Sequence, residues 1–237
     1  SVNIYDNDSE ALERTKTMIY PSRFGEWDEN IKLLNEMPGS NDFDVVIIGT
    51  PPDTHIKIAE TVLSSISPKI MLIEKPLSTP KLDDLFDLND KIDKSETLIL
   101  VGYNHNLTEN TKFVEALIKQ NNMGDPLAIH VRWMESWDCI FDAHPWLNGP
   151  QDSYLGYSAR GGGACGEHSH AISLWQHLSN LMGYGKINSV NANMREYCKH
   201  GLDYDESTVL VLRSENDLYG TIIQDVITTQ PTKNALI

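Results

Sequence analysis

The sequence contains few cysteines and no long hydrophobic run. Its three cysteines are far apart and lack a Cys-x-x-Cys spacing, which is typical of reduced thiols in a cytoplasmic protein. No apolar run approaches the ~20 residues that a membrane-spanning helix needs, and no secretory signal is recognisable. We therefore expect a cytoplasmic protein without disulfide bonds or membrane spans.

Basic residues are also scarce. The chain has 19 Lys and Arg against 34 Asp and Glu, a net charge of −15. Such an acidic surface repels phosphate backbones and anionic lipids, so we expect neither nucleic acid nor a membrane as partner. The 237 residues, 40% of them hydrophobic, suffice for one large or two small domains.

The sequence lacks a start methionine and begins with a strand-like run, Val2–Tyr5. We expect a chain that is incomplete at both ends. Asp6 follows this run, where the second strand of a dinucleotide-binding unit carries the acidic residue that binds the adenosine ribose. That role depends on a glycine-rich turn about 20 residues upstream, which the sequence does not contain, so an ordinary strand-end role for Asp6 stays open.

Strand-like and helix-like patterns alternate up to about residue 104. Short apolar runs at Val45–Ile48, Ile70–Ile73 and Thr97–Val101 predict strands covered on both faces. Helices are predicted over Asp28–Glu36, from about Pro52, and over Ser78–Asp93, with a turn at Pro38–Asn41. This alternation predicts the α/β class, with a Rossmann-type parallel sheet.

The pattern changes after residue 104. Helices are predicted at Glu109–Asn121 and Ala164–Leu181, with a strand at Leu127–Met134 and a long irregular loop at 135–163 between them. Three strand-like runs, 187–196, 206–213 and 218–227, then follow without helices and predict a largely antiparallel open sheet. We therefore predict a Rossmann-like domain over residues 1–104 and an α+β domain over 105–237.

Polar residues follow two of the predicted parallel strands. Thr50, Pro51 and His55 come after the first strand, and Glu74 and Lys75 after the second. Carboxyl ends of parallel strands share one edge, where open α/β sheets bind their ligands. Lys75 is therefore a candidate ligand contact, with Glu74 as its counter-charge. A simple strand-to-helix turn and an exposed lysine are the alternatives.

Three consecutive glycines, 161–163, precede the helix predicted from Ala164 and allow a close backbone contact. On one helix, Glu167 and His170 would share a face and form a general base with an orienting carboxylate. Two alternatives stay open: a glycine-rich helix entry with surface histidines, and a metal site that uses His168 and His170.

Taken together, these motifs resemble the Gfo/Idh/MocA family of nicotinamide-dependent oxidoreductases. The resemblance extends along nearly the whole chain and rests on Thr50-Pro51-x-x-x-His55, Glu74-Lys75-Pro76, Gly102-Tyr103-Asn104 and the glycine run that leads to Glu167 and His170. It implies a Rossmann domain followed by a substrate domain, whose open sheet would form the interface of a dimer or tetramer.

The resemblance also implies residue roles. Lys75 would contact the reacting hydroxyl and the nicotinamide, His170 would be the acid/base, and Glu167 would orient His170 or bind substrate. Cofactor contacts would come from Asp6, Thr50, Pro51, His55, Glu74, Lys75 and Asn104. Substrate contacts would come from Lys75, His170, Arg160 and aromatic residues of the long loop, namely Trp137, Trp146, Tyr154 and Tyr157, although these aromatics could instead form core.

Two positions depart from the family pattern: Asn106 stands where an arginine is usual, and Ser173 where an aspartate is usual, which suggests an unusual substrate pocket. No basic residue directly follows Asp6, which favours NAD over NADP because a carboxylate repels a 2′-phosphate. We therefore expect an NAD-dependent dehydrogenase for a CH–OH group of a sugar, cyclitol or sugar derivative, without a metal. A non-catalytic ligand-binding relative and a metal-dependent hydrolase are the alternative hypotheses.

Overall fold

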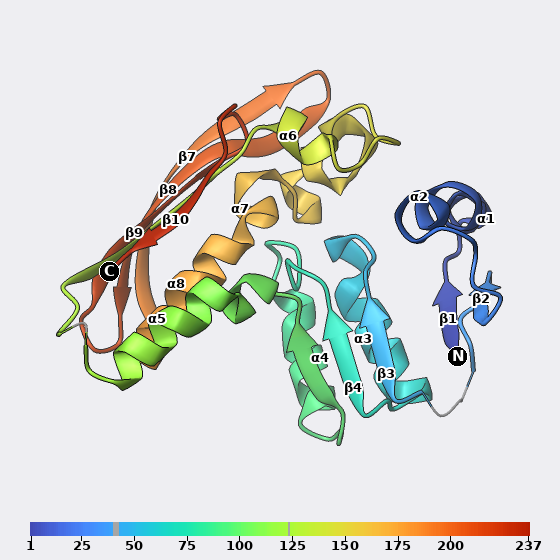
Figure 1. Ribbon diagram of the computed structural model, residues 1–237, viewed down its shortest axis with the longest axis horizontal. Helices are drawn as coiled ribbons and strands as arrows, with labels where there is room; N and C mark the ends of the chain where they lie inside the picture. Colours follow the sequence, from blue (N-terminus) through green and yellow to red (C-terminus); the bar gives the residue numbers. More distant parts are fainter. Residues whose placement is uncertain (40–42, 123) are drawn as a thin grey trace.

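The computed structural model describes residues 1–39, 43–122 and 124–237, which form three sheets (Figure 1). The first sheet pairs two parallel strands, β1 (Val2–Tyr5) and β2 (Ile31–Leu34), which are joined by the helical segments α1 (Ser9–Arg14), η1 (Thr15–Ile19) and α2 (Tyr20–Phe24). The turn predicted at Pro38–Asn41 extends into residues 40 and 41, which lie outside the described residues.

The segment predicted as a helix at Asp28–Glu36 is a strand instead. Residues Ile31–Leu34 pair with β1 in parallel register. Ile31, Leu33 and Leu34 fit a helical or an extended pattern equally well, because periodicity cannot separate the two in so short an apolar run. Pairing with β1, a tertiary contact, decides the conformation.

The second sheet is parallel and has the order β3-β4-β5, and the two helices of this segment cover one of its faces. Its elements are β3 (Val45–Ile48), α3 (Pro52–Ser65), β4 (Ile70–Ile73), α4 (Asp83–Ile92) and β5 (Leu98–Val101). This alternation confirms the predicted Rossmann-type arrangement, although α4 begins five residues later than predicted and this sheet is not hydrogen-bonded to β1–β2.

The prediction that these strands are covered on both faces is wrong for the part of the chain that the structure describes. Ile48, Met71 and Ile73 are buried in the core that includes α3. On the opposite face, apolar side chains of the two outer strands are between 45% and 64% exposed: Val45, Ile47, Leu98 and Leu100. Both helices lie on the same face, so only alternate strand residues are covered.

The third sheet is mixed, with the order β10-β6-β9-β8-β7. Its strands are β6 (Ala128–Met134), β7 (Ile187–Lys199), β8 (Leu202–Ser214), β9 (Tyr219–Asp225) and β10 (Thr232–Leu236). The last three predicted strands pair antiparallel, as the pattern indicated, whereas β6 lies parallel to β9 and antiparallel to β10.

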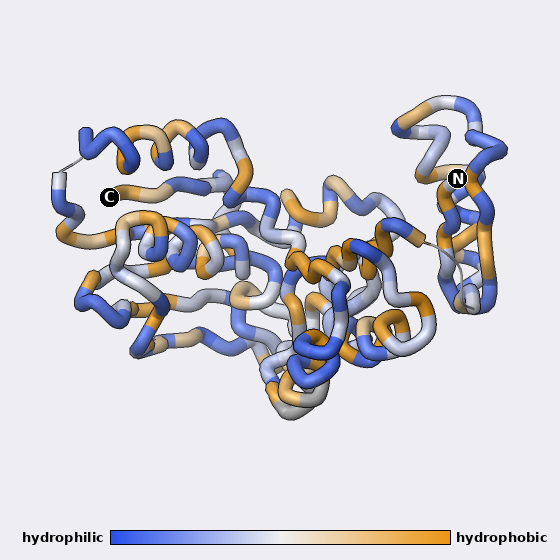
Figure 2. Tube along the Cα trace, turned by 90° about the horizontal axis from the view of Figure 1, so that it is seen from below, coloured by the Kyte–Doolittle hydropathy of each residue, from blue (hydrophilic) through white to orange (hydrophobic). Residues whose placement is uncertain are grey.

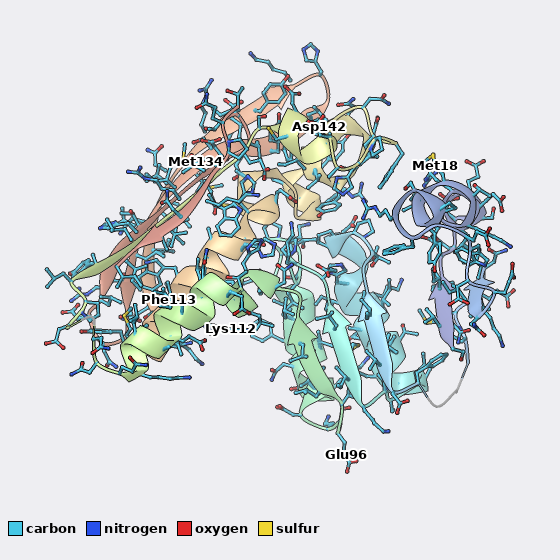
Figure 3. The ribbon with its side chains drawn as sticks, in the orientation of Figure 1. Met18, Glu96, Lys112, Phe113, Met134 and Asp142 are labelled. Carbon is cyan, nitrogen blue, oxygen red and sulfur yellow. The ribbon has the colours of Figure 1, made fainter. Side chains whose placement is uncertain are left out.

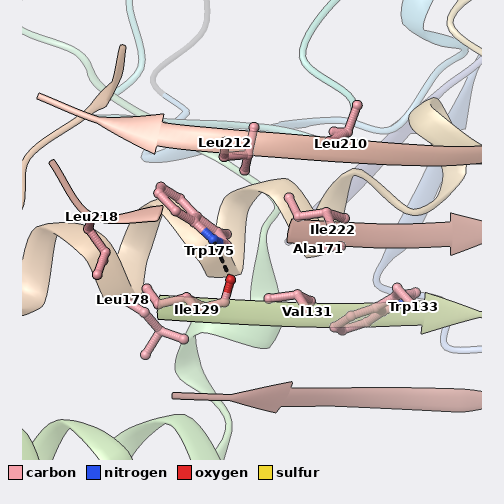
Figure 4. Close-up of a cluster of buried hydrophobic side chains, with 10 residues drawn as sticks. All are labelled: Ile129, Val131, Trp133, Ala171, Trp175, Leu178, Leu210, Leu212, Leu218 and Ile222. Atoms are coloured by element: carbon pink, nitrogen blue, oxygen red, sulfur yellow. Dashed lines mark hydrogen bonds between the residues drawn. The ribbon is translucent and has the colours of Figure 1, made fainter. Parts of the chain in front are cut away.

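Two helices, α5 (Glu109–Lys119) and α8 (Ser169–Leu181), lie beside the mixed sheet (Figure 1). Trp175 of α8 is fully buried and donates its indole N–H to the backbone oxygen of Ile129 on β6, at 3.0 Å (Figure 4). Gly220 on β9 makes room for this ring, because a Cβ there would collide with Trp175. The core thus fixes α8 on the sheet.

The single helix predicted over Ala164–Leu181 is interrupted. Helix α7 (Gly163–Glu167) ends before α8 begins, and His168 joins them with φ −95° and ψ 21°. The loop before α7 is partly helical, with α6 (Trp137–Phe141), η3 (Pro150–Asp152), η4 (Tyr154–Gly156) and η5 (Ser158–Arg160). The break places Glu167 and His170 on different helices.

Hydrophobic stretches along the chain are short (Figure 2). None of the described helices is both long and apolar enough to cross a lipid bilayer.

Candidate active site

The candidate site lies where the carboxyl ends of β3, β4 and β5 meet the start of α8 (Figure 1). Parallel pairing directs the residues after each strand, including Thr50, Lys75 and Asn104, to this edge. Glu96, labelled in Figure 3, precedes β5 and lies at the opposite edge. The structure therefore gathers the polar strand ends on the edge where α/β sheets bind ligands.

Lys75 and Glu167 form an ion pair across this site. The Nζ of Lys75 donates to Glu167 Oε2 at 2.8 Å and to the Glu167 backbone oxygen at 2.9 Å. The two side chains are only 14% and 20% exposed, so solvent screens the pair less than a surface ion pair. Glu167 therefore holds Lys75, and the structure does not show the expected carboxylate contact with His170.

Three aromatic rings surround the imidazole of His170. Ring centroids lie 4.6 Å away for His105, 5.9 Å for Tyr103 and 5.8 Å for Trp133, which stacks on it. Burial, followed by the positive charge of Lys75, lowers the pKa of His170 to about 3. Its ring is therefore neutral at neutral pH and keeps the lone pair that a general base requires.

Sequence reasoning missed His105 and Trp133 as parts of the site. His105 directly follows the Gly102-Tyr103-Asn104 motif, and this position was the available signal. Trp133 belongs to an alternating strand whose inward residues are buried, so its pattern indicated only core. Burial lowers the pKa of His105 as well, which makes its ring a second neutral imidazole beside His170.

Glu74 lies against the exit of β5. A Cβ at Gly102 would come within 2.8 Å of Glu74 Oε2, so the Glu74 carboxylate lies directly against the backbone of Gly102. Burial and the charges of Glu167 and Glu74 raise the pKa of Tyr154, which keeps its hydroxyl protonated near the two carboxylates. Of the aromatic residues in the long loop, Tyr154 therefore lies close enough to the site for the charges of Glu167 and Glu74 to affect its pKa.

The His55 side chain connects two turns at the carboxyl edge of the parallel sheet. It is fully buried, with Nε2 2.6 Å from the Thr50 backbone oxygen and Nδ1 3.0 Å from the Pro76 backbone oxygen. The ring thus joins the turn after β3 to the turn after β4. The structure therefore places His55 beneath the expected cofactor contacts, whereas Thr50 remains exposed and Pro51 precedes the first turn of α3.

Arg160 and Trp146 were expected to contact substrate, and both have protein partners. Arg160 Nε donates to Asp53 Oδ2 of α3 at 2.7 Å. Trp146 packs against His144, with ring centroids 5.4 Å apart. Trp137 packs in a cluster with Tyr204. The structure therefore supports the alternative prediction, that Trp137 forms part of a core.

Asp6 and Asn104 occupy the ends of strands. Asp6 follows β1, where Oδ1 accepts a hydrogen bond from the Asp8 N–H at 2.9 Å. Asn104 is exposed and begins η2 (Asn104–Leu107) directly after β5. Each side chain lies at a carboxyl end, as expected, but the β1–β2 sheet is separate from β3–β5.

The glycine run is packed against other parts of the protein. A Cβ on Gly162 would collide with the Tyr154 backbone oxygen, and one on Gly163 with the Asp205 carboxylate. At Gly161 a Cβ would lie 2.9 Å from Pro52. Residues 161–166 have the spacing G-x-G-x-x-G, but they follow η5 instead of a strand, and protein atoms fill the space that a pyrophosphate would need.

The residues present fit the nicotinamide end of a dinucleotide. Gly49 has no atoms within 4 Å of where its Cβ would lie, so the surface beside Thr50 and Lys75 is open to a flat group. For a metal the fit is poor: His168 Nε2 lies 2.9 Å from the Asp225 backbone oxygen. The residues that the structure describes contain no group of three His, Cys, Asp or Glu side chains able to hold a metal ion.

Comparisons with known proteins agree with this geometry. Residues 1–103 match the GFO_IDH_MocA family, described as an oxidoreductase family with an NAD-binding Rossmann fold. An 89-residue stretch, 38% of this chain, is 32% identical to inositol 2-dehydrogenase 1 of Mycolicibacterium vanbaalenii and covers 25% of that protein.

Two solved structures share the fold over 99% of this chain. Levoglucosan dehydrogenase in complex with NADH and levoglucosan has a TM-score of 0.76 at 20% identity, with 60% of its own chain covered. The WlbA dehydrogenase of Bordetella pertussis in complex with NADH and UDP-GlcNAcA has a TM-score of 0.72 at 19% identity, with 65% covered. The chain thus spans less than two thirds of these relatives. Over residues 1–103, less than half of its length, it matches the Gfo/Idh/MocA oxidoreductase family that its motifs resemble.

Proposed function

We propose that the protein is a cytoplasmic NAD-dependent dehydrogenase that acts on a secondary alcohol of a sugar, cyclitol or sugar derivative. Residues 1–104 would form its cofactor domain and residues 105–237 its substrate domain. The observation that carries the proposal is the Lys75–Glu167 ion pair beside the neutral ring of His170, at the ligand-binding edge of a Rossmann-type sheet. Relatives that act on inositol and levoglucosan support the substrate class.

The side chains divide the proposed reaction between them. The Lys75 ammonium would donate a hydrogen bond to the reacting hydroxyl oxygen and stabilise the negative charge that develops there. The neutral His170 imidazole would accept the hydroxyl proton. NAD, when bound, would accept a hydride from the carbon that bears this hydroxyl. The buried ring of Trp133, stacked on His170, would hold the imidazole in place.

Other residues of the chain would bind the cofactor and form the interface between subunits. Thr50, Pro51, Glu74 and Asn104 would line the nicotinamide half, and the Asp6 carboxylate would bind the adenosine ribose and disfavour NADP. The mixed sheet also has exposed apolar residues on β8, on the face away from α8: Val209 and Val211, 38% and 46% exposed. Their exposure supports a homo-oligomer through this sheet.

Enzyme assays test the proposal. We would follow the reduction of NAD with a panel of cyclitols and sugars, and measure NADH binding separately by fluorescence. His170→Ala and Lys75→Ala are each expected to lower kcat by about 10²–10⁴-fold, with NADH binding retained. NADH binding without turnover of any substrate would favour the non-catalytic relative. Unchanged rates in both variants on the true substrate would overturn the assignment.

A further inference from the structure

The base proposed for the reaction lacks the partner that should orient it. Glu167, the expected partner, is engaged by Lys75. Three buried polar side-chain atoms near the start of α8 have no hydrogen-bond partner among the described residues: Oγ of Ser169, Nδ1 of His170 and Oδ1 of Asn106. Buried polar groups are nearly always paired in folded proteins, so three such atoms in one region require an explanation.

Contacts between η2 and α8 place Asn106 beside His170. Asn106 Nδ2 donates to the Ser173 hydroxyl at 2.9 Å. Ser173 is three residues after His170 within α8, so the two side chains lie on one helix face. The residue before Asn106, His105, has its ring centroid 4.6 Å from that of His170. The Asn106 amide therefore lies on the face of α8 that presents His170.

The loop that carries Asn106 is held in place. Thr111 donates its hydroxyl to the His105 backbone oxygen at 2.8 Å, and Thr108 caps α5, which follows η2. The ring of His105 also packs edge-on against Trp133, with centroids 4.6 Å apart. Asn106 is thus presented by a fixed segment, as a positioning residue requires.

We propose that Asn106 is the positioning residue that fixes the tautomer of His170: its Oδ1 accepts, through one bridging water, the hydrogen bond that the Nδ1–H of His170 donates. An amide oxygen only accepts hydrogen bonds, so the water donates to Oδ1 and accepts from the ring nitrogen, which carries the proton. This leaves the lone pair on Nε2. On the proposed dehydrogenase function, Nε2 then accepts the hydroxyl proton of the substrate.

The charged and titratable groups that act on His170 are Lys75, His105, His168 and Lys233. All four lower its pKa, and none of them holds a hydrogen bond to its ring in the described structure. The ring therefore carries a single proton at neutral pH. Two tautomers are available to the neutral ring, one with the proton on Nδ1 and one with the proton on Nε2.

Long-range ¹⁵N–¹H NMR of the histidine-labelled protein tests the proposal, with His170→Gln to assign the signal. The expected result at neutral pH is a protonated Nδ1 and an unprotonated Nε2. Asn106→Leu is expected to move the proton to Nε2 and to lower kcat about 10–100-fold with little change in KM, as losses of orienting partners do. Asn106→Asp keeps an acceptor, so Nδ1 should stay protonated and the pKa of His170 should rise.

Protonated Nε2 in the unmutated protein would overturn the proposal, and this measurement requires only the assignment variant His170→Gln to fold, not an Asn106 variant. An unchanged tautomer in Asn106→Leu, or an unchanged His170 titration in Asn106→Asp, would also overturn it. The tautomer is measured without substrate, so an absence of dehydrogenase activity would count against the proposed function and leave this result readable.

Discussion

The Lys75 ammonium and the Glu167 carboxylate meet at 2.8 Å although 92 residues separate them in the chain. One follows a strand of the parallel sheet, and the other ends the short helix that lies before α8. Their contact therefore connects the predicted cofactor segment to the predicted substrate segment, and its strength can be measured.

Removing Lys75 should cost folding stability as well as activity. Lys75→Met leaves the largely buried Glu167 carboxylate without its partner, and we expect a loss of about 1–3 kcal/mol in the free energy of unfolding, measured with urea. Lys69→Met breaks an ion pair whose side chains are 81% and 75% exposed, so it should leave the free energy of unfolding nearly unchanged. Equal losses in the two variants would contradict the buried character of the Lys75 pair.

Gly163 should tolerate no side chain. Its φ is 79°, and an added Cβ would collide with Asp205. Gly183 has a similar φ of 81° with open space around it, which makes it a matched control. We expect Gly183→Ala to cost about 1 kcal/mol from backbone strain alone, and Gly163→Ala to cost clearly more, in urea unfolding followed by circular dichroism. Similar losses of stability in the two variants would show that packing does not constrain the glycine run at residues 161–163.

Acid should weaken the fold partly through His170. The pKa of this residue is about 3 in the folded protein, against an ordinary value of 6.5, so the unfolded chain binds the proton first as pH falls. Its contribution to stability is therefore complete above about pH 6.5 and is lost progressively between about pH 6.5 and pH 3.

His170→Gln should reduce this acid sensitivity. The difference in urea midpoint between about pH 7 and about pH 5 is expected to be smaller in the variant. It should not vanish, because burial also lowers the pKa values of His105 and His168. An identical difference in the variant and the unmutated protein would contradict the shifted pKa.

Arg160 and Asp53 should act as a unit. Arg160→Gln and Asp53→Asn each break the same contact, so the double variant should resemble either single variant, with a coupling energy of about 0.5–1 kcal/mol in urea unfolding. If Arg160 bound substrate directly, its replacement would instead raise KM far more than replacement of Asp53. Comparing KM for the three variants distinguishes these outcomes.

Much of the fold could be predicted because the local pattern and the final structure agree. The runs at β3, β4 and β5 are short, apolar and separated by helical periodicity, so they could hardly pair in another way. The prediction for residues 31–34 was wrong because three apolar residues in so short a run do not define a period, and only the contact with β1 makes the segment a strand. The helix break at His168 also has no local signal, since its neighbours suit a helix.

The site was predictable where a residue follows a strand end and was not where tertiary packing selects it. Lys75 and His170 come from motifs, and the structure brings them close enough for the Lys75 charge to act on His170. The partners of Glu167 and Arg160 depend on how distant segments meet, which spacing does not determine. Trp133 reaches His170 only because α8 crosses the inner face of β6.

The helix break at His168 has a consequence for the lysine. By ending α7 there, the chain keeps the backbone oxygen of Glu167 for Lys75, in addition to its carboxylate. An ammonium has three N–H groups, and these two acceptors occupy two of them. The third N–H has no acceptor within the described part of the chain, which leaves Lys75 one directed donor for an incoming oxygen and no lone pair with which to accept a proton.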